Sequence, residues 1–119
     1  MMEVLKQEEL RLSVIARELV GTDHGLEITL LFVDAAPGQG PSLHRHPYDE
    51  VFIVQEGQAS FRLADEQLEV AAGDIVVAHA NEPHAFVNSG AGPLRQVDIH
   101  VSPTMKTEWL EERETPEVP

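Results

Sequence analysis

Short apolar runs separated by Gly, Pro and Asp dominate the hydrophobic pattern of this chain. The run at residues 26–33 is rich in β-forming residues and is soon followed by Pro37-Gly38. Further runs follow at residues 50–55, 59–63, 68–70, 75–78, 84–87 and 94–101. Turn residues such as Glu56-Gly57 and Gly73-Asp74 lie between them. Many short strands divided by turns predict an all-β fold, either a sandwich or a barrel.

The two ends of the chain have less distinct patterns. Apolar residues in the segment 10–20 fit either the spacing of a helix or the alternation of a strand, and the pattern alone leaves both open. Residues 104–114 are interpreted as a short C-terminal helix, with Trp109 and Leu110 packing back on the barrel. They open an acidic tail over residues 104–119, which we interpret as a solvated segment that aids solubility.

Length and composition favour a single domain. A chain of 119 residues with 42% hydrophobic residues can form one core but not two. We therefore expect one domain over residues 1–119, with a core barrel at about 24–102. The absence of cysteine excludes disulfides, thiolate zinc sites and a cysteine nucleophile. The start of the chain lacks the pattern of a signal peptide, and no apolar run approaches the ~20 residues that span a bilayer, so a soluble cytoplasmic protein is expected.

The net charge limits the classes of partner. A formal charge of −13 argues against nucleic acid, because phosphates require a basic surface. It equally disfavours binding to an anionic membrane surface. A small molecule is the expected partner.

Metal-ligating residue types are concentrated in the segment 38–50. His44 and His46 stand two apart, so on a strand their imidazoles point to the same face. On a continuous strand Glu50 would lie about 13 Å beyond His46, at about 3.3 Å per residue, which is too far to share an ion. Pro47 favours a bend and lacks an N–H for strand pairing, so residues 47–49 can return Glu50 toward the histidines. The spacing predicts a metal site formed by a strand, a bend and the next strand.

The same segment resembles a known family. It matches the first motif of the cupins, G-x5-H-x-H-x3-E-x6-G, without a gap at Gly38, His44, His46, Glu50 and Gly57. The second cupin motif, G-x5-P-x-G-x2-H-x3-N, is matched at Gly73, His84 and Asn88, whereas its Pro and second Gly are replaced by His79 and Asn81. Both replacements lie in the turn before His84, where Asn tolerates turn geometry.

The resemblance to cupins has four implications. It implies a double-stranded β-helix, also called a jelly roll or cupin barrel. It implies a strand in the segment 10–20, and a homodimer in which that strand joins the partner's sheet. It implies His44, His46, Glu50 and His84 as ligands of one divalent transition metal ion per subunit. Three imidazoles and one carboxylate suit Fe, Mn, Ni, Co, Cu or Zn, and in a six-coordinate site they leave two positions open.

Other residues are candidates for a pocket around the metal. Phe52, Val54 and Phe86 share strand parity with Glu50 or His84, and we expect them to give the metal an apolar substrate pocket. Tyr48 lies between the ligands His46 and Glu50 and is a further candidate for orienting a substrate.

Three polar residues are candidates for proton transfer. Asp98 and His100 lie on the same face of a predicted strand, so both become general acid–base candidates if that face is interior. His79 stands in the loop that leads to His84, and it could titrate near neutral pH at the pocket rim.

Three functions remain open from the sequence. The first hypothesis is a metal-dependent enzyme of the oxygenase or oxidoreductase type that acts on a small organic substrate in the barrel. The second is a non-redox enzyme, such as an isomerase, epimerase, cyclase or lyase, that uses the metal as a Lewis acid. The third is a non-catalytic module that binds a metal or a small ligand. The fold hosts many chemistries, so the choice depends on the site.

Overall fold

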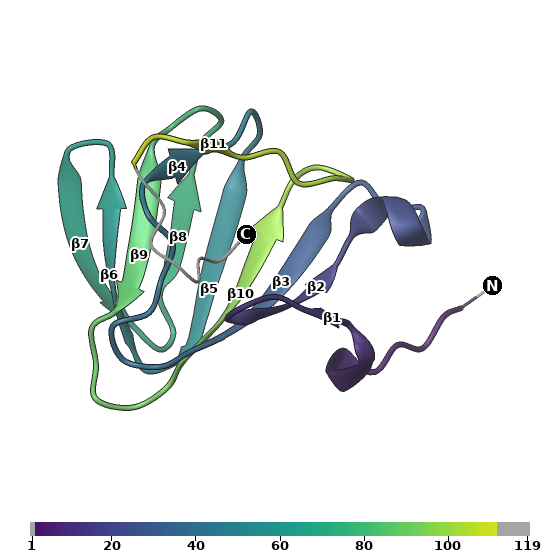
Figure 1. The fold of residues 1–119 in the computed structure, drawn as a ribbon, viewed down its shortest axis with the longest axis horizontal. Coiled ribbons are helices and arrows are strands. Elements are labelled where there is room, and N and C mark those ends of the chain that lie inside the picture. The colour runs from purple at the N-terminus through teal and green to yellow at the C-terminus, as the bar shows by residue number, and fades with distance from the viewer. Residues whose placement is uncertain (1, 112–119) are drawn as a thin grey trace.

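The computed structural model describes residues 2–111 and folds into two antiparallel sheets (Figure 1). One sheet has the strand order β1-β2-β3-β10-β5-β8, and the other has the order β11-β4-β9-β6-β7. The strands are β1 (Arg11–Leu12), β2 (Ala16–Leu19), β3 (Thr29–Ala35), β4 (His44–Arg45), β5 (Glu50–Glu56), β6 (Gln58–Leu63), β7 (Glu66–Ala71), β8 (Ile75–Ala78), β9 (His84–Asn88), β10 (Leu94–His100) and β11 (Glu108–Trp109). Two short 3-10 helices, η1 (Gln7–Glu9) and η2 (Gly21–His24), accompany them.

The chain repeatedly crosses from one sheet to the other. Strands β3, β5, β8 and β10 belong to the first sheet, and β4, β6, β7, β9 and β11 to the second. Most strands therefore pair with strands distant in the sequence, such as β5 with β10 and β4 with β9. This arrangement is the double-stranded β-helix, and it confirms the predicted all-β fold class.

Alternating side chains of the strands fill the space between the sheets. Every second residue of β3 and β10 is buried, and in β5 the same alternation buries Glu50, Phe52 and Val54, as period-two patterning requires. The apolar part of the interior is centred on Phe52 and Phe61, whose rings meet at 4.9 Å in an edge-to-face arrangement. A fully buried Phe side chain contributes about 1.5–3 kcal/mol by leaving water, so these rings hold the sheets together.

One end of the interior is polar. The inward face of β10 carries Leu94, Gln96, Asp98 and His100, all of them buried. The polar face of this strand is thus interior. Asp98 and His100 therefore remain candidates for general acid–base chemistry. The barrel places its apolar core at one end and its ionisable residues at the other.

The segment 10–20 forms strands and not a helix. It contains β1 and β2, which pair with each other, and β2 pairs with β3 of the same chain at Leu19↔Leu30. The first sheet therefore extends through its own N-terminal segment, and β1 forms its outer edge.

The predicted C-terminal helix is wrong over the described residues. Residues 104–111 contain no helix, and β11 pairs instead with β4 at Trp109↔His44. The N–H groups of Leu110 and Glu111 both reach the carbonyl oxygen of Leu43, at 2.9 and 3.3 Å. Pairing with β4 satisfies the main chain in an extended form, and this tertiary contact outweighs weak helical spacing. Residues 112–114 of the predicted helix lie outside the described part. Among residues 2–111 no helix is long and apolar enough to cross a bilayer.

Candidate metal centre

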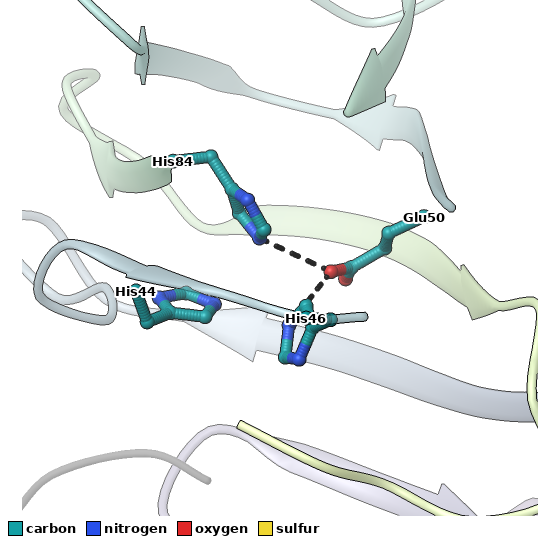
Figure 2. Close-up of side chains that lie close together, drawn as sticks. All are labelled: His44, His46, Glu50 and His84. Atoms are coloured by element: carbon teal, nitrogen blue, oxygen red, sulfur yellow. Dashed lines mark hydrogen bonds and ion pairs between the residues drawn. The ribbon is translucent and has the colours of Figure 1, made fainter. Parts of the chain in front are cut away.

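Four side chains from three strands and one connection meet inside the barrel. His44 opens β4 and lies opposite His84 of β9, His46 follows β4, and Glu50 opens β5. One ligand atom of each lies within 4.8 Å of the others, and all four residues are buried. Figure 2 shows the carboxylate of Glu50 pointing between His84 and His46, with His44 beside them. The predicted ligands are therefore together, and the group could hold a metal ion.

The connection between β4 and β5 brings Glu50 back, as the sequence predicted. A bend at Pro47 and Tyr48 replaces the continuous strand. Asp49 fixes this bend, because its Oδ1 accepts the N–H of Ala80 at 2.9 Å. Asn81 donates its N–H to the carbonyl of His46 at 2.7 Å, and its φ of 66° lies in the left-handed region that Asn tolerates. These two hydrogen bonds join the bend between β4 and β5 to the turn before β9.

Main-chain carbonyls orient all three imidazoles of the cluster. Nδ1 of His44 lies 2.7 Å from the Ser42 carbonyl oxygen, and Nδ1 of His46 lies 2.7 Å from that of Lys106. Nδ1 of His84 lies 2.9 Å from the carbonyl oxygen of Glu82. A carbonyl oxygen can only accept, so each Nδ1 carries a proton, and each ring, when neutral, presents an Nε2 lone pair to the centre. Burial, followed by the nearby His84, lowers the pKa of His44 to about 3, so this ring is neutral near pH 7.

The carboxylate of Glu50 faces two of these lone pairs. Its Oε1 lies 3.1 Å from Nε2 of His46 and 3.2 Å from Nε2 of His84. Nε2 of His46 is buried without a hydrogen-bond partner. Burial alone would raise the pKa of Glu50, but contacts with His100, His46 and His84 hold it well below its usual range. An anionic oxygen facing imidazole lone pairs requires an added proton or a cation between them, so these residues fit a divalent ion.

A small cavity adjoins the cluster. Its free volume is about 20 Å³, which is room for about one water molecule. The lining combines three cluster residues with apolar and polar neighbours: Ile15, Ala16, Leu31, Val33, Pro41, His44, His46, Glu50, Phe52, Phe86, Asp98 and His100. A cavity of this size, lined largely by apolar side chains, has room for one water-sized molecule next to the cluster.

Two of the four predicted pocket residues line this cavity. Phe52 and Phe86 contribute to its wall. Val54 does not, because it lies two residues further along β5 and is fully buried in the core. Tyr48 is half-buried at the bend and does not line the cavity either, because its ring stacks on that of His46 at 5.0 Å.

The structure places Asp98 and His100 beside the cluster. Asp98 lines the cavity, and its Oδ1 accepts a hydrogen bond from Nε2 of Gln96 at 2.9 Å. Burial, reinforced by the charge of Glu50, raises the pKa of Asp98 well above its ordinary value, which favours the neutral acid. Nε2 of His100 lies 3.0 Å from Oε2 of Glu50, and its Nδ1 lies 2.7 Å from Oη of Tyr48.

The structure does not bring His79 to the cavity. Its side chain is 77% exposed, and its Nδ1 lies 3.7 Å from Oδ1 of Asp49 at the surface. The reason is the turn before β9, in which Glu82 accepts the N–H of His79 at 3.1 Å. That turn directs His79 outward and leaves His84 to point inward.

Sequence patterns missed the contribution of the C-terminal segment. Lys106 accepts the Nδ1–H of His46 through its carbonyl and donates its N–H to Tyr48, at 2.7 and 3.2 Å. The ring of Trp109 lies 4.9 Å from that of His44. Main-chain contacts of Lys106 leave no sequence signal. Trp109 packs back on the barrel as expected, whereas Leu110, expected to do the same, is exposed.

Comparison with solved structures places the fold among known proteins. A polyketide cyclase, RemF, from Streptomyces resistomycificus is similar with a TM-score of 0.77 and 20% identity, over 98% of this chain and 90% of the other. An uncharacterized conserved protein with a double-stranded beta-helix domain from Klebsiella pneumoniae has a TM-score of 0.75 and 23% identity, over 94% and 100%. Oxalate decarboxylase from Bacillus subtilis, studied for its Mn(II) centers, has a TM-score of 0.74 and 22% identity, over 86% of this chain and 30% of the other.

Comparison at the level of sequence gives the family. No curated protein matches the chain. The family model of the Cupin domain matches residues 31–100, which is more than half of the chain and includes all four cluster residues. The chain belongs to the cupin domain family.

Proposed function

We propose that this chain is a metal-dependent enzyme that acts on a small organic substrate. The proposed ligands of one divalent transition metal ion per subunit are His44, His46, Glu50 and His84. The observation that carries the proposal is the convergence of Nε2 lone pairs and a carboxylate oxygen in a buried site. When bound, such an ion supplies Lewis acidity and, if it is redox-active, electron transfer.

Residues around the ligands support a reaction rather than storage of an ion. Phe52 and Phe86 provide apolar walls that limit water next to the cluster. Asp98 brings a neutral carboxyl to the same cavity, where it can donate a hydrogen bond or a proton to a bound molecule. A site with a ligand set, a cavity and a proton donor has the parts that an enzyme requires.

Two reaction classes fit this site. An enzyme of the oxygenase or oxidoreductase type needs a redox-active metal with open positions and an apolar pocket. A non-redox isomerase, epimerase, cyclase or lyase needs a group that moves a proton, and the buried neutral acid Asp98 specifically favours this class. Both a cyclase and a decarboxylase are among the similar structures, so the fold itself does not fix the reaction.

The test combines metal analysis with turnover. We expect the gently purified chain to contain about one transition metal ion per subunit, with Fe, Mn, Ni, Co, Cu and Zn quantified together. Candidate substrates are then screened with the native metal, in air and without dioxygen. Dependence on dioxygen would identify the oxygenase class, and turnover without dioxygen would identify the non-redox class.

Glu50→Ala should abolish turnover while the fold is retained. A chain that is metal-free and takes up none of these ions on titration would refute the proposal.

We also propose that the protein is a homodimer. The outer face of the first sheet supports this, because Phe32, Val97 and Ile53 are cross-strand neighbours there and Ile75 continues the row. Ile75 is 63% exposed. A contiguous apolar row on the surface of a chain with a formal charge of −13 is suited to burial against a second copy.

Light scattering on a sizing column should give twice the chain mass, and Ile75→Lys should shift the measured mass toward that of the monomer. A monomer at micromolar concentration would be evidence against the dimer.

A further inference from the structure

A fourth buried imidazole, that of His100, lies against the cluster but is held differently. His100 is opposite Glu50 in the register of β10 and β5, and it is 3% exposed. Its Nε2 lies 3.0 Å from Oε2 of Glu50, the oxygen that the cluster histidines do not approach in their ion-pair contacts. Its Nδ1 contacts a side chain, Oη of Tyr48, at 2.7 Å, whereas His44, His46 and His84 use main-chain carbonyls.

The hydroxyl of Tyr48 determines where the proton of His100 lies. Oη of Tyr48 accepts the N–H of Lys106 at 3.2 Å, and its phenol O–H remains available to donate. That proton needs an acceptor. Nδ1 of His46 is 3.3 Å away, but it already donates to the carbonyl of Lys106. Nδ1 of His100 is closer and has no carbonyl partner, so it accepts from Tyr48.

This assignment reverses the tautomer of His100 relative to the cluster. A neutral imidazole that accepts at Nδ1 carries its proton at Nε2. The Nε2–H of His100 therefore faces the carboxylate of Glu50, although at 3.0 Å it is not well aligned for a hydrogen bond. The three cluster histidines present lone pairs at Nε2, and His100 presents a proton. His100 is suited to hold Glu50 and unsuited to ligate an ion.

We propose that His100, oriented by Tyr48, is a positioning residue that engages Oε2 of Glu50 and leaves Oε1 as its single ligand oxygen. The inference rests on the proposed metal site and assigns new roles within it. Binding through one oxygen keeps positions on a six-coordinate ion open for a substrate. The main chain of Lys106 contacts both Tyr48 and His46. The C-terminal segment therefore helps to orient both side chains.

The first test measures tautomers directly. Long-range 1H–15N correlation spectra of the ¹⁵N-histidine-labelled protein distinguish Nδ1–H from Nε2–H rings, with and without Zn(II). We expect Nε2–H for His100 in both forms, and Nδ1–H with Nε2 bound to zinc for the other three. An Nδ1–H tautomer for His100, or a zinc-bound His100, would overturn the proposal. This measurement needs no variant, and in the metal-free protein it does not depend on activity or metal binding.

The second test uses variants at the two positions. We expect His100→Leu to weaken Zn(II) binding by about 10–100-fold in a chelator competition, the usual effect of losing a partner of a ligand. Tyr48→Phe should weaken it less, and His100→Gln should restore part of the loss because its amide can donate to Glu50. His24→Gln is the matched control, because His24 pairs with Glu3 near the N-terminus and should leave binding unchanged.

The spectrum of bound Co(II) separates positioning from folding. Loss of the restraint on Oε2 should change the d–d absorption of Co(II) in His100→Leu and Tyr48→Phe, while far-UV circular dichroism stays that of the wild type. Wild-type affinity and an unchanged Co(II) spectrum in His100→Leu would refute the inference. If the wild type binds neither ion, the proposed function fails, and the tautomers of the metal-free protein still decide whether His100 presents a proton to Glu50.

Discussion

At the scale of single residues, the location of protons distinguishes a ligand from its neighbours. His44, His46 and His84 each donate Nδ1–H to a carbonyl, so their Nε2 atoms are left to face one another and the carboxylate of Glu50 at the centre of the cluster. Neutral rings and a charged carboxylate are the protonation states that a divalent ion requires. The candidate site is therefore prepared for a cation by hydrogen bonds outside it.

Glu50→Gln tests the carboxylate with little change in shape. The variant removes the negative charge and the anionic ligand, so we expect Zn(II) affinity to fall by more than about 100-fold, beyond the effect of an outer partner. Isothermal titration with Zn(II) measures the change. Glu56→Gln, at the other, exposed end of β5, is the control and should bind as the wild type does. Equal affinities for the wild type and Glu50→Gln would remove Glu50 from the ligand set.

Asp98→Asn tests the buried neutral acid through the pH dependence of stability. The pKa of Asp98 is raised in the folded protein, so the native state binds more protons than the unfolded state above about pH 4. Its contribution is fully present below the unfolded pKa and is lost as the pH rises through the folded pKa.

We therefore expect Asp98→Asn to raise the free energy of unfolding of the metal-free protein at pH 7 and to change it little at pH 4. The amide retains an oxygen that can accept from Gln96. Urea denaturation at both pH values measures the difference. A loss of stability at pH 7, or the same change at both pH values, would contradict the neutral state of Asp98.

The sequence predicted the residues of the cluster but not their hydrogen-bond partners. Spacing and Pro47 together indicated that His44, His46 and Glu50 meet, because these residues are close along the chain. Tyr48 and His100 are 52 residues apart, and their contact depends on the register of β5 with β10. Parity placed Asp98 and His100 on one face, and only the packing of the two sheets shows that this face is interior.

At the scale of elements, the short strand β11 closes the second sheet over the cluster. It pairs with β4, places Trp109 on His44, and follows the stretch in which Lys106 contacts His46 and Tyr48. The spacing of residues 104–114 predicted a helix here, because local patterns do not reveal the available edge on β4. Tertiary pairing decided the conformation of the segment.

Trp109→Ala tests this element. Loss of the indole removes packing from His44, and we expect it to reduce the free energy of unfolding by about 1–3 kcal/mol, within the range of most single substitutions. Zn(II) affinity should fall as well, because His44 loses a neighbour that restrains its ring. Leu110→Ala is the matched control, since Leu110 is exposed and its main chain donates to Leu43, the residue before β4. If both variants behave as the wild type does, β11 is not a support of the site.

At the scale of the whole molecule, two sheets with an apolar core at one end hold the polar cluster at the other. The apolar runs between turn signals predicted the short strands β3 and β5 to β10, whereas β11 was predicted as part of a helix. The pairing of distant strands, such as β5 with β10, came from the cupin resemblance, because local patterns do not encode strand order. The proposed ligands come from both sheets, so ion binding should stabilise the barrel as a whole.

Removal of the metal tests this coupling. An ion that binds only the folded state adds about 2.7 kcal/mol at a free concentration 100 times its Kd. We expect a chelator to lower the Tm of the metal-loaded wild type, and Zn(II) to restore it. The Tm of Glu50→Gln should respond to neither treatment. A wild-type Tm that is insensitive to both would mean that the cluster does not bind an ion in the folded state.

Anomalous diffraction from crystals of the metal-loaded protein tests the central claim most directly. With data collected at the absorption edge of the bound metal, we predict one strong peak inside the barrel. It should lie about 2.0–2.2 Å from Nε2 of His44, His46 and His84 and from one oxygen of Glu50. A map with no peak between these four side chains, in crystals soaked with each candidate ion, would contradict the account.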